Sequence, residues 1–88
     1  MDDDLLHATL ARVAANVRRL RLEQKLTQAE LAEQASIDLR YLQRVEAGTV
    51  HAGVGYVAAL AVALGVQAGE LFVPAKPHAR PHGRPPKR

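Results

Sequence analysis

Apolar residues in the first quarter of the chain recur at intervals of three and four, which is the period of one face of an α-helix. The stripe consists of Leu6, Leu10, Val13, Val17 and Leu20, and Ala14 widens it. The acidic run at residues 2–4 precedes the stripe, and negative charge stabilises a helix N-terminus. We therefore expect one long helix over residues 5–24, with any fraying confined to the part before Leu6.

Thr27 marks the start of a second expected helix. Glu30 follows at the spacing of a capping box, in which the threonine hydroxyl accepts a hydrogen bond from the Glu30 amide and the Glu30 carboxylate accepts one from the Thr27 amide. The pattern predicts a helix over residues 28–35, followed by a short break at Ser36 and Ile37.

Asp38 is the next candidate for an N-cap. It would open a third helix that runs to about Glu46 and ends at Gly48, a residue suited to left-handed backbone. A loop is expected over residues 49–53.

A fourth apolar stripe follows this loop, and we expect most of it in the core. Its members are Val54, Val57, Ala58, Leu60, Ala61 and Leu64. Gly65 ends this helix, and a fifth, short helix is predicted over residues 67–72. Because no strand pattern or repeat is present, we expect an all-α fold with one domain over residues 5–73.

Composition agrees with a small helical domain. Of the 88 residues 48% are apolar, Ala and Leu dominate them, and aromatic residues make up only 3%. The absence of cysteine excludes disulfides, cysteine zinc sites and a catalytic thiol. We expect a cytoplasmic protein that does not bind membranes, because the acidic start does not resemble a signal peptide and no apolar run approaches the roughly 18 residues of a membrane span. The chain has nine arginines and three lysines, a bias that suggests GC-rich coding and therefore indicates a bacterial or phage source.

The net charge of +3 is unevenly divided along the chain. Residues 74–88 carry five basic side chains and no acid, whereas residues 1–73 carry seven basic and nine acidic side chains, a net charge of −2. This tail also contains five prolines, so it can bury little apolar surface and is predicted to be disordered. Its charge favours a polyanionic partner such as nucleic acid, and the alternative is a segment that only increases solubility.

Residues 28–47 combine two short helices with a tight turn. Ala32 is small where two steeply crossing helices must approach closely, and Ile37, Leu42 and Val45 are placed to pack on the core. The remaining face of the third helix carries Leu39, Arg40, Gln43 and Arg44, with Tyr41 at its edge. This pattern is typical of a helix-turn-helix, whose second helix enters the major groove of DNA.

Four short segments of the chain form a set of motifs with defined distances between them. They are Val17-Arg18-Arg19-Leu20-Arg21, Leu26-Thr27-Gln28-Ala29-Glu30-Leu31-Ala32, Val45-Glu46-Ala47-Gly48 and Ala63-Leu64-Gly65-Val66. Together they resemble the Cro and phage-repressor (XRE) helix-turn-helix family over roughly residues 10–72. Residues 38–48 are also similar to the controller regulators of restriction–modification systems. The resemblance implies a compact five-helix, lambda-repressor-like domain that binds double-stranded DNA as a homodimer.

The resemblance also implies roles for individual residues. Base readout is assigned to Leu39, Arg40, Gln43 and Arg44. Arginine reads guanine, glutamine reads adenine, and leucine can contact only a thymine methyl. Contacts to DNA phosphates are assigned to Thr27, Gln28, Tyr41, Thr49 and His51. Tyr41 is equally suited to packing on the second helix, and the amides of residues 53–55 could also meet a phosphate.

Arg21 and Glu46 match a structural ion pair of the family. Three positions depart from its pattern. Ser36 stands where the family has a glycine in the turn, Ala52 where it often has a proline, and Leu39 where it commonly has a polar reader.

Within the tail, residues 80–85 (Arg-Pro-His-Gly-Arg-Pro) resemble a degenerate AT-hook, a segment that lies in the minor groove of A·T-rich DNA. The simpler interpretation is a non-specific electrostatic arm. In either case the tail residues expected to contact DNA are Arg80, Arg84, Lys87 and Arg88.

Catalysis is not expected from this sequence. The chain has no glycine-rich phosphate loop and no carboxylate pair with an obvious pocket, and its four histidines lack metal-ligand spacing. We therefore expect no enzyme activity, cofactor or metal.

The sequence predicts a sequence-specific transcription regulator, most simply a repressor, that binds a palindromic operator as a homodimer and is nucleoid-associated when bound. The alternative is a protein-interaction module, such as an antitoxin or the small subunit of a complex, that uses the same fold to bind a protein partner.

Overall fold

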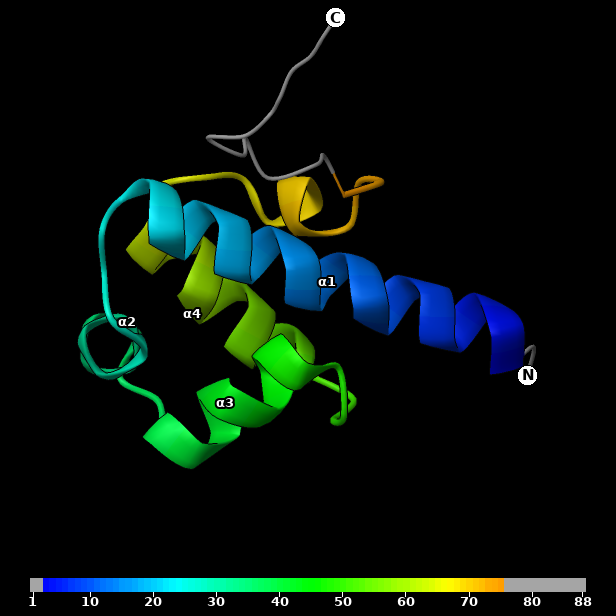
Figure 1. Cartoon of the computed structure of the whole chain (residues 1–88), viewed down its shortest axis with the longest axis horizontal. Helices are drawn as coiled ribbons and strands as arrows, with labels where there is room; N and C mark the ends of the chain where they lie inside the picture. Colours follow the sequence, from blue (N-terminus) through cyan, green and yellow to red (C-terminus); the bar gives the residue numbers. More distant parts are fainter. Residues whose placement is uncertain (1–2, 76–88) are drawn as a thin grey trace, which may run out of the picture.

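The computed structural model describes residues 3–75, and this part of the chain is entirely helical apart from its connections. The elements are α1 (Asp3–Glu23), α2 (Gln28–Ala35), α3 (Leu39–Ala47), α4 (Val54–Leu64) and a 3₁₀ turn, η1 (Ala68–Leu71). Figure 1 shows α1 running along the domain, with α3 on one side of it and η1 on the other. The prediction of an all-α fold is confirmed. The predictions made for residues 76–88, including the four side chains expected to contact DNA, lie outside the described residues.

Helix starts follow the capping residues. The Thr27 hydroxyl accepts a hydrogen bond from the Glu30 amide at 3.0 Å, and the Glu30 carboxylate accepts one from the Thr27 amide at 2.8 Å, which completes the predicted capping box. The Asp38 carboxylate accepts a hydrogen bond from the Tyr41 amide and caps α3. The first helix begins at Asp3, two residues before the expected start, because two aspartates occupy its first turn.

Helix ends also agree with the sequence. Gly48 and Gly65 adopt left-handed backbone with φ of 73° and 75°, so α3 and α4 end where glycine permits this conformation. The fifth predicted helix is shorter than expected and is a 3₁₀ turn. Gly69 lies within it and Pro74 follows soon after, and neither residue supports a longer α-helix.

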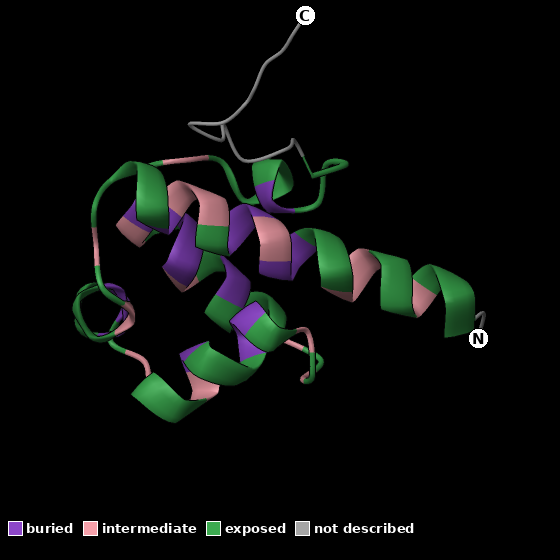
Figure 2. Ribbon diagram, viewed as in Figure 1, coloured by how far each residue is buried: buried purple, intermediate pink, exposed green. Residues whose placement is uncertain are grey.

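The core takes one or more fully buried leucines or valines from every element. They are Val17, Leu31, Leu42, Leu60 and Leu71. Figure 2 shows the buried positions on the sides of the helices that face one another. The prediction that most of the fourth stripe lies in the core is confirmed, and two of its members lie outside the core. Val54 is 86% exposed and Ala58 is exposed, because only the repeat of Val57, Leu60, Ala61 and Leu64 faces the core.

Asn16 connects α1 to the C-terminal end of the described chain. It is fully buried, and its side-chain nitrogen donates hydrogen bonds to the carbonyls of Leu71 and Val73, each at 3.0 Å. These bonds satisfy a buried amide group and hold the segment after η1 against α1. Within the described residues, no helix combines the length and apolar character needed to cross a membrane.

Candidate nucleic-acid interface

The turn between α2 and α3 keeps the expected geometry without a glycine. Ser36 adopts left-handed backbone with φ of 58° and ψ of 44°. The Ser36 amide donates to the Glu33 carbonyl and the Ile37 amide donates to the Ala32 carbonyl, so the final carbonyls of α2 are satisfied. Serine therefore occupies the left-handed conformation that the family's glycine would adopt.

The two faces of α3 differ sharply in exposure. Leu42 and Val45 are buried against the core, whereas Arg40, Gln43 and Arg44 are exposed and Leu39 retains 38% of its accessible surface. Arg40, Gln43, Arg44 and Thr49 line one shallow depression on this face. The structure thus brings together three of the four predicted base-reading side chains and one predicted phosphate contact.

A buried ion pair fixes α3 against α1. The Arg21 Nε lies 2.7 Å from the Glu46 Oε2, and its Nη2 donates to the Glu46 Oε1 at 3.0 Å. The remaining Arg21 nitrogen donates to the Leu26 carbonyl at 2.9 Å. Because the guanidinium and carboxylate meet through two parallel bonds, the pair sets orientation as well as distance.

Gln28, the first residue of α2, belongs to the same network. Its side-chain nitrogen donates to the Glu46 Oε1 at 3.0 Å, and the residue is half-buried. This bond holds the predicted phosphate clamp in place beside the amides at the α2 N-terminus. Thr27, just before it, is exposed, and its hydroxyl oxygen serves as the helix cap.

Arg18 is a residue that the sequence reasoning did not assign to the interface. It is exposed on α1 and lines one hollow together with Arg21, Gln28, Gln43 and Glu46. The signal that could have identified it is its spacing of three residues from Arg21, which places both arginines on one side of the helix. Since Glu46 already neutralises Arg21, Arg18 supplies positive charge to this part of the surface.

The loop after α3 holds the other predicted backbone contacts. The Thr49 amide and hydroxyl both donate to the Arg44 carbonyl, at 3.0 Å and 3.2 Å. His51 is exposed further along the loop. Gly53 is the N-cap of α4 and has no side chain to accept a hydrogen bond from the first-turn amides, which leaves that helix start suited to an anion.

Tyr41 stacks on Tyr56, with ring centroids 4.3 Å apart and ring planes 36° apart. Tyr41 is half-buried, and Tyr56 in the first turn of α4 is 46% exposed. The aromatic partner of Tyr41 therefore lies on α4 rather than on α2. The sequence reasoning assigned no role to Tyr56. The only feature that distinguished this residue was that aromatic residues are scarce in the chain.

Comparison with known proteins agrees with this geometry. Residues 17–71 match the family described as Helix-turn-helix (HTH_3). The chain belongs to the helix-turn-helix family. No curated protein matches it.

Several solved structures are similar to the chain. One is the hypothetical transcription factor NHTF from Neisseria, with 33% sequence identity and a TM-score of 0.73 over 75% of this chain and 76% of that one. Another is the restriction-modification controller protein C.AhdI from Aeromonas hydrophila, with 32% identity and a TM-score of 0.69 over 72% of this chain and 96% of that one. Family membership and these similarities identify the chain as a DNA-binding regulator of transcription rather than an enzyme.

Proposed function

We propose that the protein is a sequence-specific repressor that binds a palindromic operator as a homodimer. The observation that carries this proposal is the exposed face of α3. Arg40, Gln43 and Arg44 project from a helix whose opposite side is anchored in the core, and the Arg21–Glu46 pair orients that helix. Such a face suits the major groove, where side chains meet the edges of bases.

Within this proposal the base-reading side chains recognise three different bases in the major groove. Arg40 and Arg44 each donate two hydrogen bonds to guanine, Gln43 pairs with adenine, and Leu39 contacts a thymine methyl. Phosphate contacts fix the position of the domain without reading sequence. They come from Thr27, Gln28, Tyr41, Thr49 and His51, and we add Arg18 from its place beside Gln28.

Exposed apolar side chains support pairing of two copies. On α4, Val54 is 86% and Val62 is 80% exposed, and Phe72 and Val73 after η1 are each 40% exposed. A two-fold pairing through α4 and this segment would present two recognition helices about 34 Å apart, one turn of DNA. Occupying such a site in a promoter blocks polymerase, which is the simplest route to repression.

In vitro selection from a random DNA pool tests the proposal. The full chain should enrich an inverted repeat with half-sites about 10 base pairs apart, centre to centre. The double variant Arg40→Ala/Arg44→Ala, with the same fold, should enrich nothing. A single half-site would contradict the homodimer. Absence of enrichment with the unaltered chain would overturn sequence-specific binding and favour the protein-interaction module.

Fusion of the selected site to a reporter promoter then tests the sign of regulation. Expression of the protein should lower reporter output, and the double variant should not. An increase in output would contradict repression while leaving operator recognition intact.

A further inference from the structure

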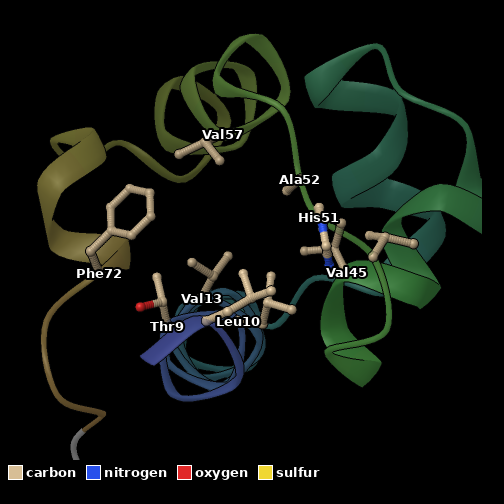
Figure 3. Close-up of a pocket in the computed structure, with 10 residues that line it drawn as sticks. Thr9, Leu10, Val13, Val45, His51, Ala52, Val57 and Phe72 are labelled. Carbon is tan, nitrogen blue, oxygen red and sulfur yellow. The ribbon is translucent and has the colours of Figure 1, made fainter. Parts of the chain in front are cut away.

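An apolar pocket of about 170 Å³ lies where the first half of α1, the loop after α3, α4 and the segment after η1 meet. It is lined by Leu6, Thr9, Leu10, Val13, Val45, Val50, His51, Ala52, Val57 and Phe72. Figure 3 shows Phe72 on one side of the pocket, Val45 and His51 on the opposite side, and Leu10 and Val13 below. None of the lining residues is acidic, and none is lysine or arginine.

We propose that this pocket binds a small, uncharged aromatic molecule with a single ring and one polar substituent. Size is the first argument, since the pocket volume is close to the roughly 150 Å³ of an apolar cavity that admits one benzene ring. The aliphatic walls match the faces of such a ring, and Phe72 offers an aromatic partner.

The two polar side chains in the lining define the substituent. The Thr9 hydroxyl donates to the Leu5 carbonyl at 2.8 Å, so its oxygen is left to accept a hydrogen bond from a ligand. His51 can accept or donate through its ring nitrogens. A hydroxyl or ring N–H therefore suits the site. A carboxylate would lose its hydration, and no lysine or arginine lines the pocket to replace that hydration.

The rest of the chain does not supply a better occupant. Residues 76–88 consist of Lys, Arg, His, Pro, Ala and Gly, so they contain no large apolar side chain to fill the pocket. The pocket also touches both surfaces of the proposed function, because His51 is a proposed phosphate contact and Phe72 belongs to the proposed pairing surface. That link rests on the proposed function, whereas ligand binding itself does not.

Titration of the full chain with phenol, followed by NMR without DNA, tests the inference. Phenol should cause saturable shifts of the Val45, Val57 and Phe72 signals with a Kd of about 1 mM or below, which is within reach for a ligand of this size. Toluene, which lacks the polar substituent, should bind at the same place but more weakly than phenol, and benzoate should bind at least about tenfold more weakly than phenol.

Two variants fill the pocket from different walls. Thr9→Leu on α1 and Ala52→Leu in the loop should each weaken phenol binding at least about tenfold, because an added side chain takes up the space of the ring. Ala8→Leu, at an exposed position of α1, is the matched control and should leave the Kd unchanged. Circular dichroism of each variant verifies the fold, and two independent sites keep the test valid if one variant unfolds.

Three results would overturn the inference. They are the absence of saturation up to about 10 mM phenol, undiminished binding in both filled variants, and shifts of the buried Val45 and Val57 signals with protein concentration alone, which would indicate a second copy in the pocket. Because DNA is absent throughout, none of these results bears on operator selection, and failure of the selection does not bear on the pocket.

Discussion

Two residues of this domain hold left-handed backbone without being glycine. They are Lys25, with φ of 60°, and Ser36, with φ of 58°. For an L-residue this conformation costs roughly 1–2 kcal/mol. Ser36 accepts that cost within the turn of the helix-turn-helix, where the carbonyls of α2 require partners. The sequence placed Ser36 in a turn, but it carried no signal for Lys25, because lysine has no preference that distinguishes this site.

Replacing Ser36 with glycine should therefore stabilise the domain. The gain is limited to about 0.5–1 kcal/mol in the free energy of unfolding, since glycine also increases the entropy of the unfolded chain. Urea denaturation measures it. The control is Gln34→Gly at an exposed position within α2, which should destabilise by about 1 kcal/mol. A loss of stability in Ser36→Gly would show that the serine side chain contributes more than its backbone strain costs.

Arg40 and Arg44 carry the residue-scale prediction for recognition. Each change to alanine should weaken operator binding by about 1–3 kcal/mol, and the loss should be smaller on random DNA, because base contacts specify and phosphate contacts only position. Fluorescence anisotropy at fixed salt gives both numbers. Arg12→Ala, in the exposed part of α1, removes the same charge away from α3 and should change neither. Equal losses on the two DNAs would show that Arg40 and Arg44 contact the DNA phosphates rather than the bases.

At the scale of elements, local sequence signals determined how well the helix ends could be predicted. The capping box at Thr27, the cap at Asp38 and the glycines at 48 and 65 lie next to the helix ends they define, so the sequence predicted those ends well. Periodicity predicted most of the residues that the first three helices contribute to the hydrophobic core. The reading surface of α3 followed from the same period, because burial of Leu42 and Val45 leaves only one face free.

Contacts between distant elements could not be predicted in the same way. Asn16 bonds to carbonyls 55 and 57 residues later, and Tyr41 finds its ring partner on another helix. Periodicity does not specify which helices meet at these points. It also included Val54 in the apolar stripe of the fourth helix, although this side chain is 86% exposed. Arg21 and Glu46 are the exception, since their pairing followed from the family resemblance.

The Arg21–Glu46 pair gives the prediction at this scale. Changing Arg21 to methionine leaves the Glu46 carboxylate buried without its cation, and this should reduce the free energy of unfolding by about 3–5 kcal/mol. Replacing both partners, as Arg21→Met/Glu46→Leu, should cost less than that single change, because no buried charge remains. Glu23→Ala removes the exposed partner of Arg19 and should cost under about 1 kcal/mol. Denaturant unfolding of all three variants measures these differences, and a double variant less stable than Arg21→Met would contradict the argument.

At the scale of the whole molecule, the apolar side chains left outside the core suggest pairing. If α4 and the segment after η1 form the surface between two copies, Val62→Glu should weaken the dimer at least about tenfold, because a carboxylate would lose its hydration there. Sedimentation over a range of concentrations measures the change. Leu5→Glu, at another exposed apolar position, is the control and should leave association unchanged. A purely monomeric unaltered chain, with and without operator DNA, would contradict pairing itself.

Net charge is the other property of the whole molecule, and it differs between residues 1–73 and the tail, residues 74–88. Residues 1–73 carry a net charge of −2, so the proposed DNA-binding face depends on the local placement of Arg18, Arg40 and Arg44. Residues 74–88 carry +5. The described chain ends after η1, on the other side of α1 from α3 (Figure 1). Thirteen further residues span up to about 45 Å when fully extended, which is enough to pass a helix of about 10–12 Å diameter.

Removal of residues 74–88 should therefore weaken binding about equally on operator and on random DNA. A non-specific arm needs only charge and reach, and for every phosphate that the tail no longer neutralises, the slope of log K against log salt should become shallower by about 0.9. A chain that keeps the tail but replaces its five basic residues with glutamine is the matched control, and it should behave like the truncation. An AT-hook would give a different result, with the loss concentrated on operators flanked by A·T-rich DNA and largely reproduced by Arg84→Ala. Unchanged affinity and salt slope would mean that the tail does not bind DNA, which leaves solubility or a partner other than DNA as its role.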